Sequence, residues 1–149
     1  MTGERVAVES SGAVPLDVME KTGVRDEADV DALATLGKSE ADLMVWDYHD
    51  VADGVGGAEV EVRVKGLPVG AKRALVERYR LDETHSNSYT VWKAMGSPQS
   101  PSAEQLAALK AAGGLELLTS PAWTDVEAGT VKVETRLERE SMELMRVSW

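Results

Sequence analysis

Several residue types are missing or scarce in this 149-residue chain, and each absence removes a class of site. There is no cysteine, so neither a disulfide framework nor a thiolate metal site can form. Only two histidines, His49 and His85, are available as further metal ligands. No apolar run approaches the roughly 18 residues of a membrane-spanning helix. The first residues also lack the apolar stretch of a secretory signal, which favours a cytoplasmic location.

Positive charge is scarce as well. Lys and Arg total 16 against 26 Asp and Glu, which gives a formal net charge of −10. Such a surface repels a phosphate backbone and an anionic membrane, so we expect neither nucleic acid nor a membrane as a partner. Hydrophobic residues make up 43% of the chain. A chain of this length and composition can bury a core, and we expect one domain over residues 1–149.

Alternation of apolar and charged residues predicts an antiparallel sheet. Residues 59–66 alternate valine with Glu, Arg and Lys, and residues 129–138 repeat this pattern, which is typical of strands with one solvated face. The Gly-rich residues 51–58 are expected to form a turn before the first of these strands. Further strands are expected at residues 5–10, 32–37, 41–50, 73–82, 115–118 and 141–149. About seven or more short strands indicate an all-β fold, an antiparallel β-sandwich.

One insertion of two short helices interrupts this run of strands. The first helix is predicted over residues 87–95 with Ser86 as its N-cap. The second is predicted to begin with Ser100 at the N-cap and Pro101 at the first helical position, and to end before Gly113.

The segment "YRLDETHSNSYTVWKAMGSP", residues 79–98, is the richest in polar and aromatic residues. A nucleophilic triad built on Ser86 would need a histidine positioned beside it. A zinc site would need Asp82, Glu83, His85 and His49 to converge. We favour a third interpretation, a corner at which side chains of this segment cap backbone groups where a strand turns into a helix. We therefore expect no metal site.

The aromatic residues allow two interpretations. Trp46, Tyr48, Trp92 and Trp123 could stack on sugar rings. Because the chain has no phenylalanine, we expect these rings to be the bulky pieces of the core instead.

Residues 79–109 strongly resemble the C-terminal region of glycoside hydrolase family 39, which contains β-xylosidases and α-L-iduronidases. The segments "GERVAVESSGAVPLD", "MVWDYHD" and "LELLTSPAW" resemble the bacterial β-xylosidase branch in the same order. The resemblance implies a β-sandwich that packs against a catalytic (β/α)8 barrel, and retaining hydrolysis by two glutamates in that barrel. In the family the acid/base glutamate directly follows an asparagine. Here the only asparagine, Asn87, precedes Ser88, so we expect no catalytic residue in this chain. We also expect no cofactor.

The resemblance implies an accessory, non-catalytic sandwich whose partner is a catalytic barrel, in cis or in trans, with xylo-oligosaccharide as a further ligand. The alternatives are a free-standing carbohydrate-binding module, which an exposed row of aromatics on one sheet would favour, and an independent hydrolase using Asp82, Glu83 and His85. Tyr, Trp and Met are frequent at interfaces. The expected barrel-docking surface comprises Tyr79, Asp82, His85, Tyr89, Trp92 and Met95.

Overall fold

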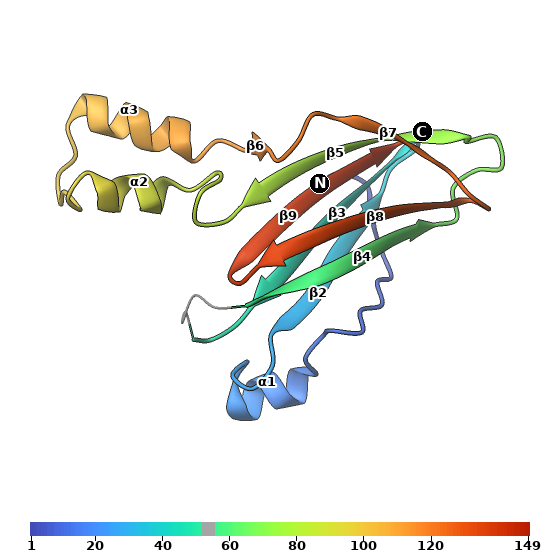
Figure 1. Ribbon diagram of the computed structural model, residues 1–149, viewed down its shortest axis with the longest axis horizontal. Coiled ribbons are helices and arrows are strands. Elements are labelled where there is room, and N and C mark those ends of the chain that lie inside the picture. The colour runs from blue at the N-terminus through green and yellow to red at the C-terminus, as the bar shows by residue number, and fades with distance from the viewer. Residues whose placement is uncertain (52–55) are drawn as a thin grey trace.

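A computed structural model describes residues 1–51 and 56–149 of the chain (Figure 1). The turn expected at residues 51–58 falls largely on residues 52–55, outside the described residues. The described part contains nine strands: β1 (Glu4–Val6), β2 (Asp29–Leu36), β3 (Glu40–Tyr48), β4 (Gly57–Lys65), β5 (Arg73–Leu81), β6 (Glu116–Leu117), β7 (Ala122–Asp125), β8 (Thr130–Glu138) and β9 (Ser141–Ser148). It also contains three helices: α1 (Leu16–Thr22), α2 (Ser88–Ala94) and α3 (Ala103–Ala112).

Seven of these strands form one sheet. Its order is β1-β2-β3-β9-β5-β6, and β7 also pairs with β5. Strands β4 and β8 form a separate two-stranded sheet, and β8 contacts β3, β7 and β9 of the larger sheet. Every pairing is antiparallel. The prediction of an all-β antiparallel fold with a few short helices is therefore confirmed, and the second layer has only two strands in the described part of the chain.

Alternation along the strands determines which side chains enter the space between the two layers. On β8, Val131, Val133 and Leu137 are at most 8% exposed, while the charged residues between them are exposed, as the sequence predicted. On the larger sheet, Leu43 of β3 lies opposite Met145 of β9, and both are buried in the same core cluster. The face of the larger sheet that bears these residues is here called the inner face, and the opposite one the outer face.

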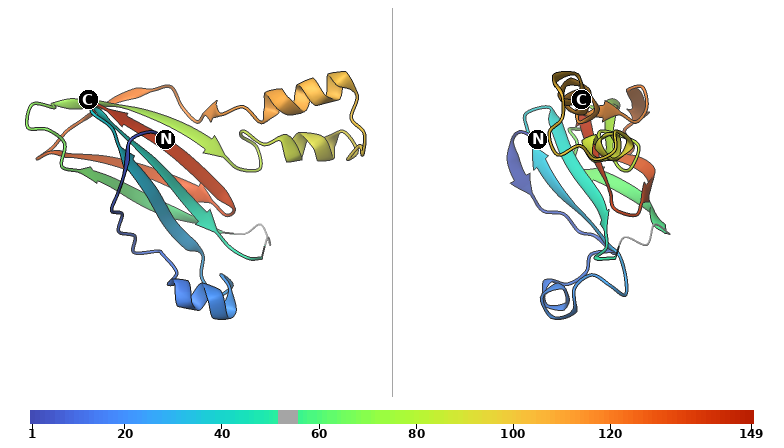
Figure 2. Two further views of the ribbon diagram at one scale, coloured as in Figure 1. Left: turned by 180° about the vertical axis from the view of Figure 1, so that it is seen from behind. Right: turned by 90° about the vertical axis from the view of Figure 1, so that its left-hand side faces the viewer.

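Helices α2 and α3 lie side by side as a hairpin that extends beyond the end of β5, away from both sheets (Figures 1 and 2). Neither helix has a fully buried residue. The two are held together in part by the Ser88 hydroxyl, which donates to the carbonyl oxygen of Leu109 at 2.7 Å. Gly113 makes this close approach possible, since a Cβ there would lie 2.5 Å from Ser88 Oγ.

Both predicted helix N-caps are wrong. Ser86 has a positive φ of 51°, and Asn87 is the N-cap of α2, accepting hydrogen bonds from the backbone N–H groups of Tyr89 and Thr90. The second helix begins two residues later than expected, because Ser102 forms a reciprocal capping box with Gln105.

The prediction that the large aromatic rings fill the core is also wrong. Trp46 and Tyr48 occupy positions of β3 that point to the outer face; Trp46 is half-buried and Tyr48 is 45% exposed. Trp123 is 57% exposed, and Trp92 is half-buried on the projecting hairpin. Val, Ala, Leu and Met side chains on the opposite positions fill the core instead.

Candidate functional site

The six residues of the predicted docking surface lie in three different surroundings. Tyr79 is half-buried on the outer face of β5, opposite Leu144 of β9. Asp82 and His85 belong to the turn that follows β5. The other three lie on α2 or directly after it: Tyr89, Trp92 and Met95. That these residues bind a barrel stays a prediction.

The aromatic pair on α2 is the most exposed part of this set. Tyr89 is 60% exposed and stacks on Trp92 with 5.6 Å between the ring centroids. The Lys93 ammonium lies 4.8 Å from the Tyr89 centroid. Trp92 donates its indole N–H to the carbonyl oxygen of Pro98 at 3.1 Å, which fixes the chain after the helix. These contacts order the hairpin locally without joining it to the sandwich core.

The turn after β5 is organised around the buried carboxylate of Asp82. Its Oδ1 atom accepts hydrogen bonds from the backbone N–H groups of Thr84 and His85 at 2.7 and 2.8 Å. The His85 Nδ1 atom lies 2.9 Å from the same oxygen. Burial acts to raise the pKa of Asp82, but the hydrogen bonds from His85 and Thr84 outweigh burial and hold that pKa below its usual value. The predicted capping corner is confirmed.

Ser86 has no catalytic geometry. Its hydroxyl donates to the carbonyl oxygen of Arg80 at 2.7 Å and accepts from the backbone N–H of Glu116 at 2.9 Å. Ser86 is 7% exposed. Its hydroxyl thus ties the end of β5 to the start of β6, and it is not paired with a histidine in any contact of the described residues.

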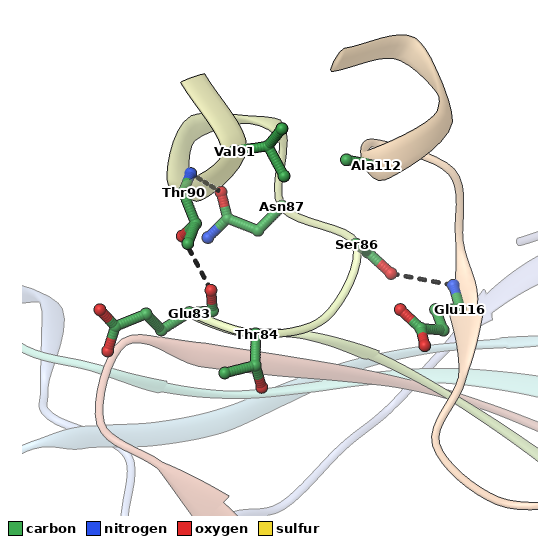
Figure 3. A pocket seen from close by; sticks show the side chains of 8 residues that line it. All are labelled: Glu83, Thr84, Ser86, Asn87, Thr90, Val91, Ala112 and Glu116. Atoms are coloured by element: carbon green, nitrogen blue, oxygen red, sulfur yellow. Dashed lines mark hydrogen bonds between the residues drawn. The ribbon is translucent and has the colours of Figure 1, made fainter. Parts of the chain in front are cut away.

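A pocket of about 420 Å3 opens between this turn and the hairpin, and Figure 3 shows its lining. Glu83 and Glu116 both line it, with the Glu83 carboxylate directed away from Glu116. Asp82 and His85 do not line it. The three side chains of the independent-hydrolase hypothesis therefore do not converge on one cavity.

The two histidines lie in separate places. His49 is 6% exposed, and its Nδ1 atom accepts a hydrogen bond from the backbone N–H of Val51 at 3.1 Å. His85 lies against Asp82 instead. Within residues 1–51 and 56–149, no group of three or more His, Asp or Glu side chains is arranged to hold a metal ion. No helix in the same ranges is long and apolar enough to cross a membrane.

A buried ionic cluster that the sequence did not reveal lies between the layers beside this turn. Glu143 of β9 is fully buried and pairs with the guanidinium groups of Arg78 and Arg80. The Thr135 hydroxyl of β8 donates to Glu143 Oε2 at 2.7 Å and accepts from Arg78 at 2.6 Å. Arg80 also lies 3.8 Å from Asp82, so the cluster continues into the turn. It cross-links both sheets at the end that bears the hairpin.

Four aromatic rings lie on the outer face, but they form no row. Trp46 and Tyr79 are not aligned with each other across the paired strands, and each is half-buried. The two exposed rings, Tyr48 and Trp123, lie at opposite ends of the sheet. The aromatic row that would favour a carbohydrate-binding module is therefore absent from the described residues.

Replacing Asp82 by alanine is expected to lower the free energy of unfolding by about 1–3 kcal/mol at pH 7, because backbone donors of the turn lose their acceptor. The folded-state pKa is lowered, so this stabilisation is present above the unfolded-state pKa of about 3.9 and disappears as the pH falls through the folded-state value. Urea unfolding between pH 7 and pH 3 measures both effects. The exposed neighbour gives the control, Glu83→Ala. An equal loss in both variants, or a pH-independent difference, would contradict this role.

The family model that matches this chain and a solved structure that shares its fold belong to the same enzyme family. The model of the family described as glycosyl hydrolases family 39 matches residues 1–124. The fold is similar to that of a bacterial orthologue of human α-L-iduronidase, with a TM-score of 0.65 and 22% identity over 90% of this chain and 23% of that one.

Two further solved structures share the fold. The family 39 enzyme of Xanthomonas axonopodis pv. citri has a TM-score of 0.61 and 16% identity, over 78% of this chain and 25% of that one. A monomeric β-xylosidase of Caulobacter crescentus has a TM-score of 0.60 and 14% identity, over 84% and 28%. The chain thus spans about a quarter of the length of these proteins. Since the family model covers most of its residues, the chain belongs to glycosyl hydrolase family 39.

Proposed function

We propose that this chain is an accessory, non-catalytic β-sandwich domain of a β-xylosidase-like retaining glycosidase, which packs against a catalytic (β/α)8 barrel in cis or in trans. The observation that carries the proposal is the family match over residues 1–124 in a chain that spans only about a quarter of its solved relatives. A barrel alone needs about 250 residues. The catalytic carboxylates of such an enzyme then belong to the part that this chain does not span.

Two buried carboxylates among the described residues, Asp82 and Glu143, support this division of labour. A retaining glycosidase needs two carboxyl groups about 5–5.5 Å apart on either side of the bond to be cleaved. Asp82 is occupied by the backbone of its own turn, and Glu143 by two arginines. Neither can reach a sugar without breaking those contacts. Sugar ligands such as xylo-oligosaccharides would bind the barrel, with the sandwich supporting it.

The purified chain is expected to show no turnover of aryl β-xylosides or aryl α-L-iduronides. The assay needs protein free of contaminating glycosidase, with Glu83→Gln and Glu116→Gln as the variants at the pocket between the turn and the hairpin, which has two carboxylates in its lining. Equal, background-level rates for all three proteins support the proposal. Hydrolysis by the parent chain that either substitution abolishes would show an independent hydrolase.

A further inference from the structure

The register of the larger sheet aligns apolar side chains from five strands on its outer face. Leu33 pairs with Met44, Met44 with Leu144, Leu144 with Tyr79, and Tyr79 with Leu117. Leu33, Met44 and Leu144 lie on the face turned away from the β4–β8 sheet, because Ala34, Leu43 and Met145 beside them in sequence form the core. Tyr79 and Leu117 lie on the same face, because paired residues of neighbouring strands share a face. The five side chains make one uninterrupted row across β2, β3, β9, β5 and β6.

A second apolar row lies beside the first. Trp46 of β3 pairs with Met142 of β9, and Met142 pairs with Leu81 of β5. The two rows together are here called the apolar band. The first row spans five strands and the second spans three, and with strands about 4.8 Å apart and rows about 6.8 Å apart these positions give the band a flat area of roughly 260 Å2. This is about the size of the largest apolar patch on a typical monomer, and such patches are often functional.

Solvent reaches the band in the described structure. Leu81 is 44% exposed and Leu117 is 42% exposed, and the other six side chains are only half-buried. Their inner-face neighbours are very different, since Met145 and Val147 have no exposed surface at all. The α2–α3 hairpin extends past the end of the sheet and the β4–β8 sheet lies on the other face, so neither covers the band (Figure 2).

The surroundings of the band are those of an interface. On one side of the band, Asp42 and Arg146 are paired across β3 and β9 and form an ion pair at 2.9 Å. Glu77 of β5 is paired with Arg146 on its other side, so the three residues form a polar row beside the band. An apolar centre with a polar rim is the usual anatomy of a protein–protein contact.

The start of the chain lies on this same face. The Met1 amino group is 3.8 Å from Asp42, and the backbone N–H of Thr2 donates to Asp42 at 3.0 Å. A polypeptide joined to Met1 would leave from the rim of the band. The part of each solved relative that this chain matches is 23–28% of its length, so about three quarters of such a protein is available to cover the face.

We infer that the apolar band is the surface on which the catalytic barrel docks, in preference to the aromatic pair of the α2–α3 hairpin. This inference rests on the proposed function and specifies its contact. The band presents few hydrogen-bonding groups, which suits the side of another protein better than the hydroxyl groups of a sugar. The hairpin offers only the Tyr89–Trp92 pair, on a projection that has no fully buried residue.

The test uses the absence of native cysteine, so that each introduced thiol is unique in this chain. The partner is the barrel of the monomeric Caulobacter crescentus β-xylosidase, expressed without the part that this chain matches. Leu144→Cys is expected to react readily with a maleimide in the isolated chain and at least about tenfold more slowly with the barrel bound. Leu106→Cys, on the exposed side of α3, is the control and should react equally in both states.

Affinity provides the second readout, by calorimetry or sedimentation. Leu144→Lys, or Leu144→Thr where lysine prevents folding, should raise the Kd at least about tenfold, because the band centre carries most of an interface's binding energy. Tyr89→Ala and Leu106→Lys should leave the Kd within about twofold. Binding that survives Leu144→Lys but not Tyr89→Ala would overturn the docking face while leaving the proposed function intact.

The remaining outcomes also decide. Sedimentation of the isolated chain shows whether a second copy covers the band. Self-association that Leu144→Lys abolishes, with no binding of the barrel, would replace the barrel by a second copy as the occupant. The proposed function itself would be overturned if the chain is monomeric and does not bind the barrel, and if Leu144→Cys reacts with the maleimide equally fast with and without the barrel.

Discussion

Replacing Glu143 by alanine is expected to lower the free energy of unfolding by about 3–5 kcal/mol, the usual cost of removing one partner from a buried ion pair. Glu143 has no exposed surface and is the carboxylate shared by Arg78 and Arg80. Without it, two guanidinium groups stay between the sheets with the Thr135 hydroxyl and a backbone carbonyl as hydrogen-bond acceptors, and the carboxylate left beside Arg80 is that of Asp82, 3.8 Å away. Urea unfolding at pH 7 measures the loss.

Two further variants show whether the loss comes from uncompensated charge. Glu134→Ala removes a carboxylate from the exposed face of β8, close in sequence to the cluster, and should change stability by no more than about 0.5 kcal/mol. A fully apolar cluster, made by combining Glu143→Leu, Arg78→Met, Arg80→Leu and Thr135→Val, should recover much of the stability, as happens when a whole buried ion cluster is replaced. A Glu143→Ala loss below about 1 kcal/mol would contradict the account.

The same cluster makes stability depend on pH. Burial acts to raise the pKa of Glu143, but hydrogen bonds from Arg78, Thr135 and Arg80 outweigh burial and lower it. A carboxyl group whose folded-state pKa is lowered stabilises the fold above its unfolded-state pKa, about 4.3, and loses this effect as the pH falls through the folded-state value. The difference between the parent chain and Glu143→Gln should therefore be constant near neutrality and shrink below about pH 4.

The strands that the sequence predicted well are those with one wet face. In β4 and β8 a charged residue follows each inward valine, so the period of two is visible without knowledge of the fold. Strand β7 was not predicted, and β6 is shorter than expected, because each is defined by its pairing with β5 and carries no alternation of its own. Strands of two to four residues depend on tertiary contacts more than on local pattern.

Strand β5 shows why the ionic cluster escaped prediction. Its inward positions carry Arg78 and Arg80, whereas Leu75, Tyr79 and Leu81 point outward. From the sequence alone, these three apolar residues would be assigned to the buried face of the strand, although they lie on the outer face of the sheet. The sequence did offer one signal. Two arginines two residues apart lie on the same face of a predicted strand, and Glu143 lies in another predicted strand, where it could pair with them.

The apolar band could not be derived from sequence either. Its main row comes from residues 33, 44, 79, 117 and 144, which five separate strands contribute. A shift of one residue in any pairing would turn that strand's contribution to the opposite face. Only the register of the folded sheet aligns these side chains. The resemblance to family 39 was sufficient for the fold class, since the family match and the solved neighbours agree with it.

The two faces of β9 should respond very differently to the same substitution. Met145 is fully buried opposite Leu43, so Met145→Ala is expected to lower the free energy of unfolding by about 2–5 kcal/mol through lost burial and the cavity left behind. The adjacent Leu144 is half-buried on the outer face, where water already reaches it. Leu144→Ala should cost no more than about 1 kcal/mol.

The pair is matched, because both variants place alanine in the same strand at neighbouring positions, and the intrinsic cost of alanine in a strand largely cancels. The difference between them therefore reports how well each face is covered in the isolated chain. Urea unfolding of the two variants at pH 7 and a range of protein concentrations gives the measurement. Equal losses would mean that the outer face is already covered when the chain is alone. In the presence of a bound barrel, Leu144→Ala should become the more damaging of the two for binding, while Met145→Ala should act through folding alone.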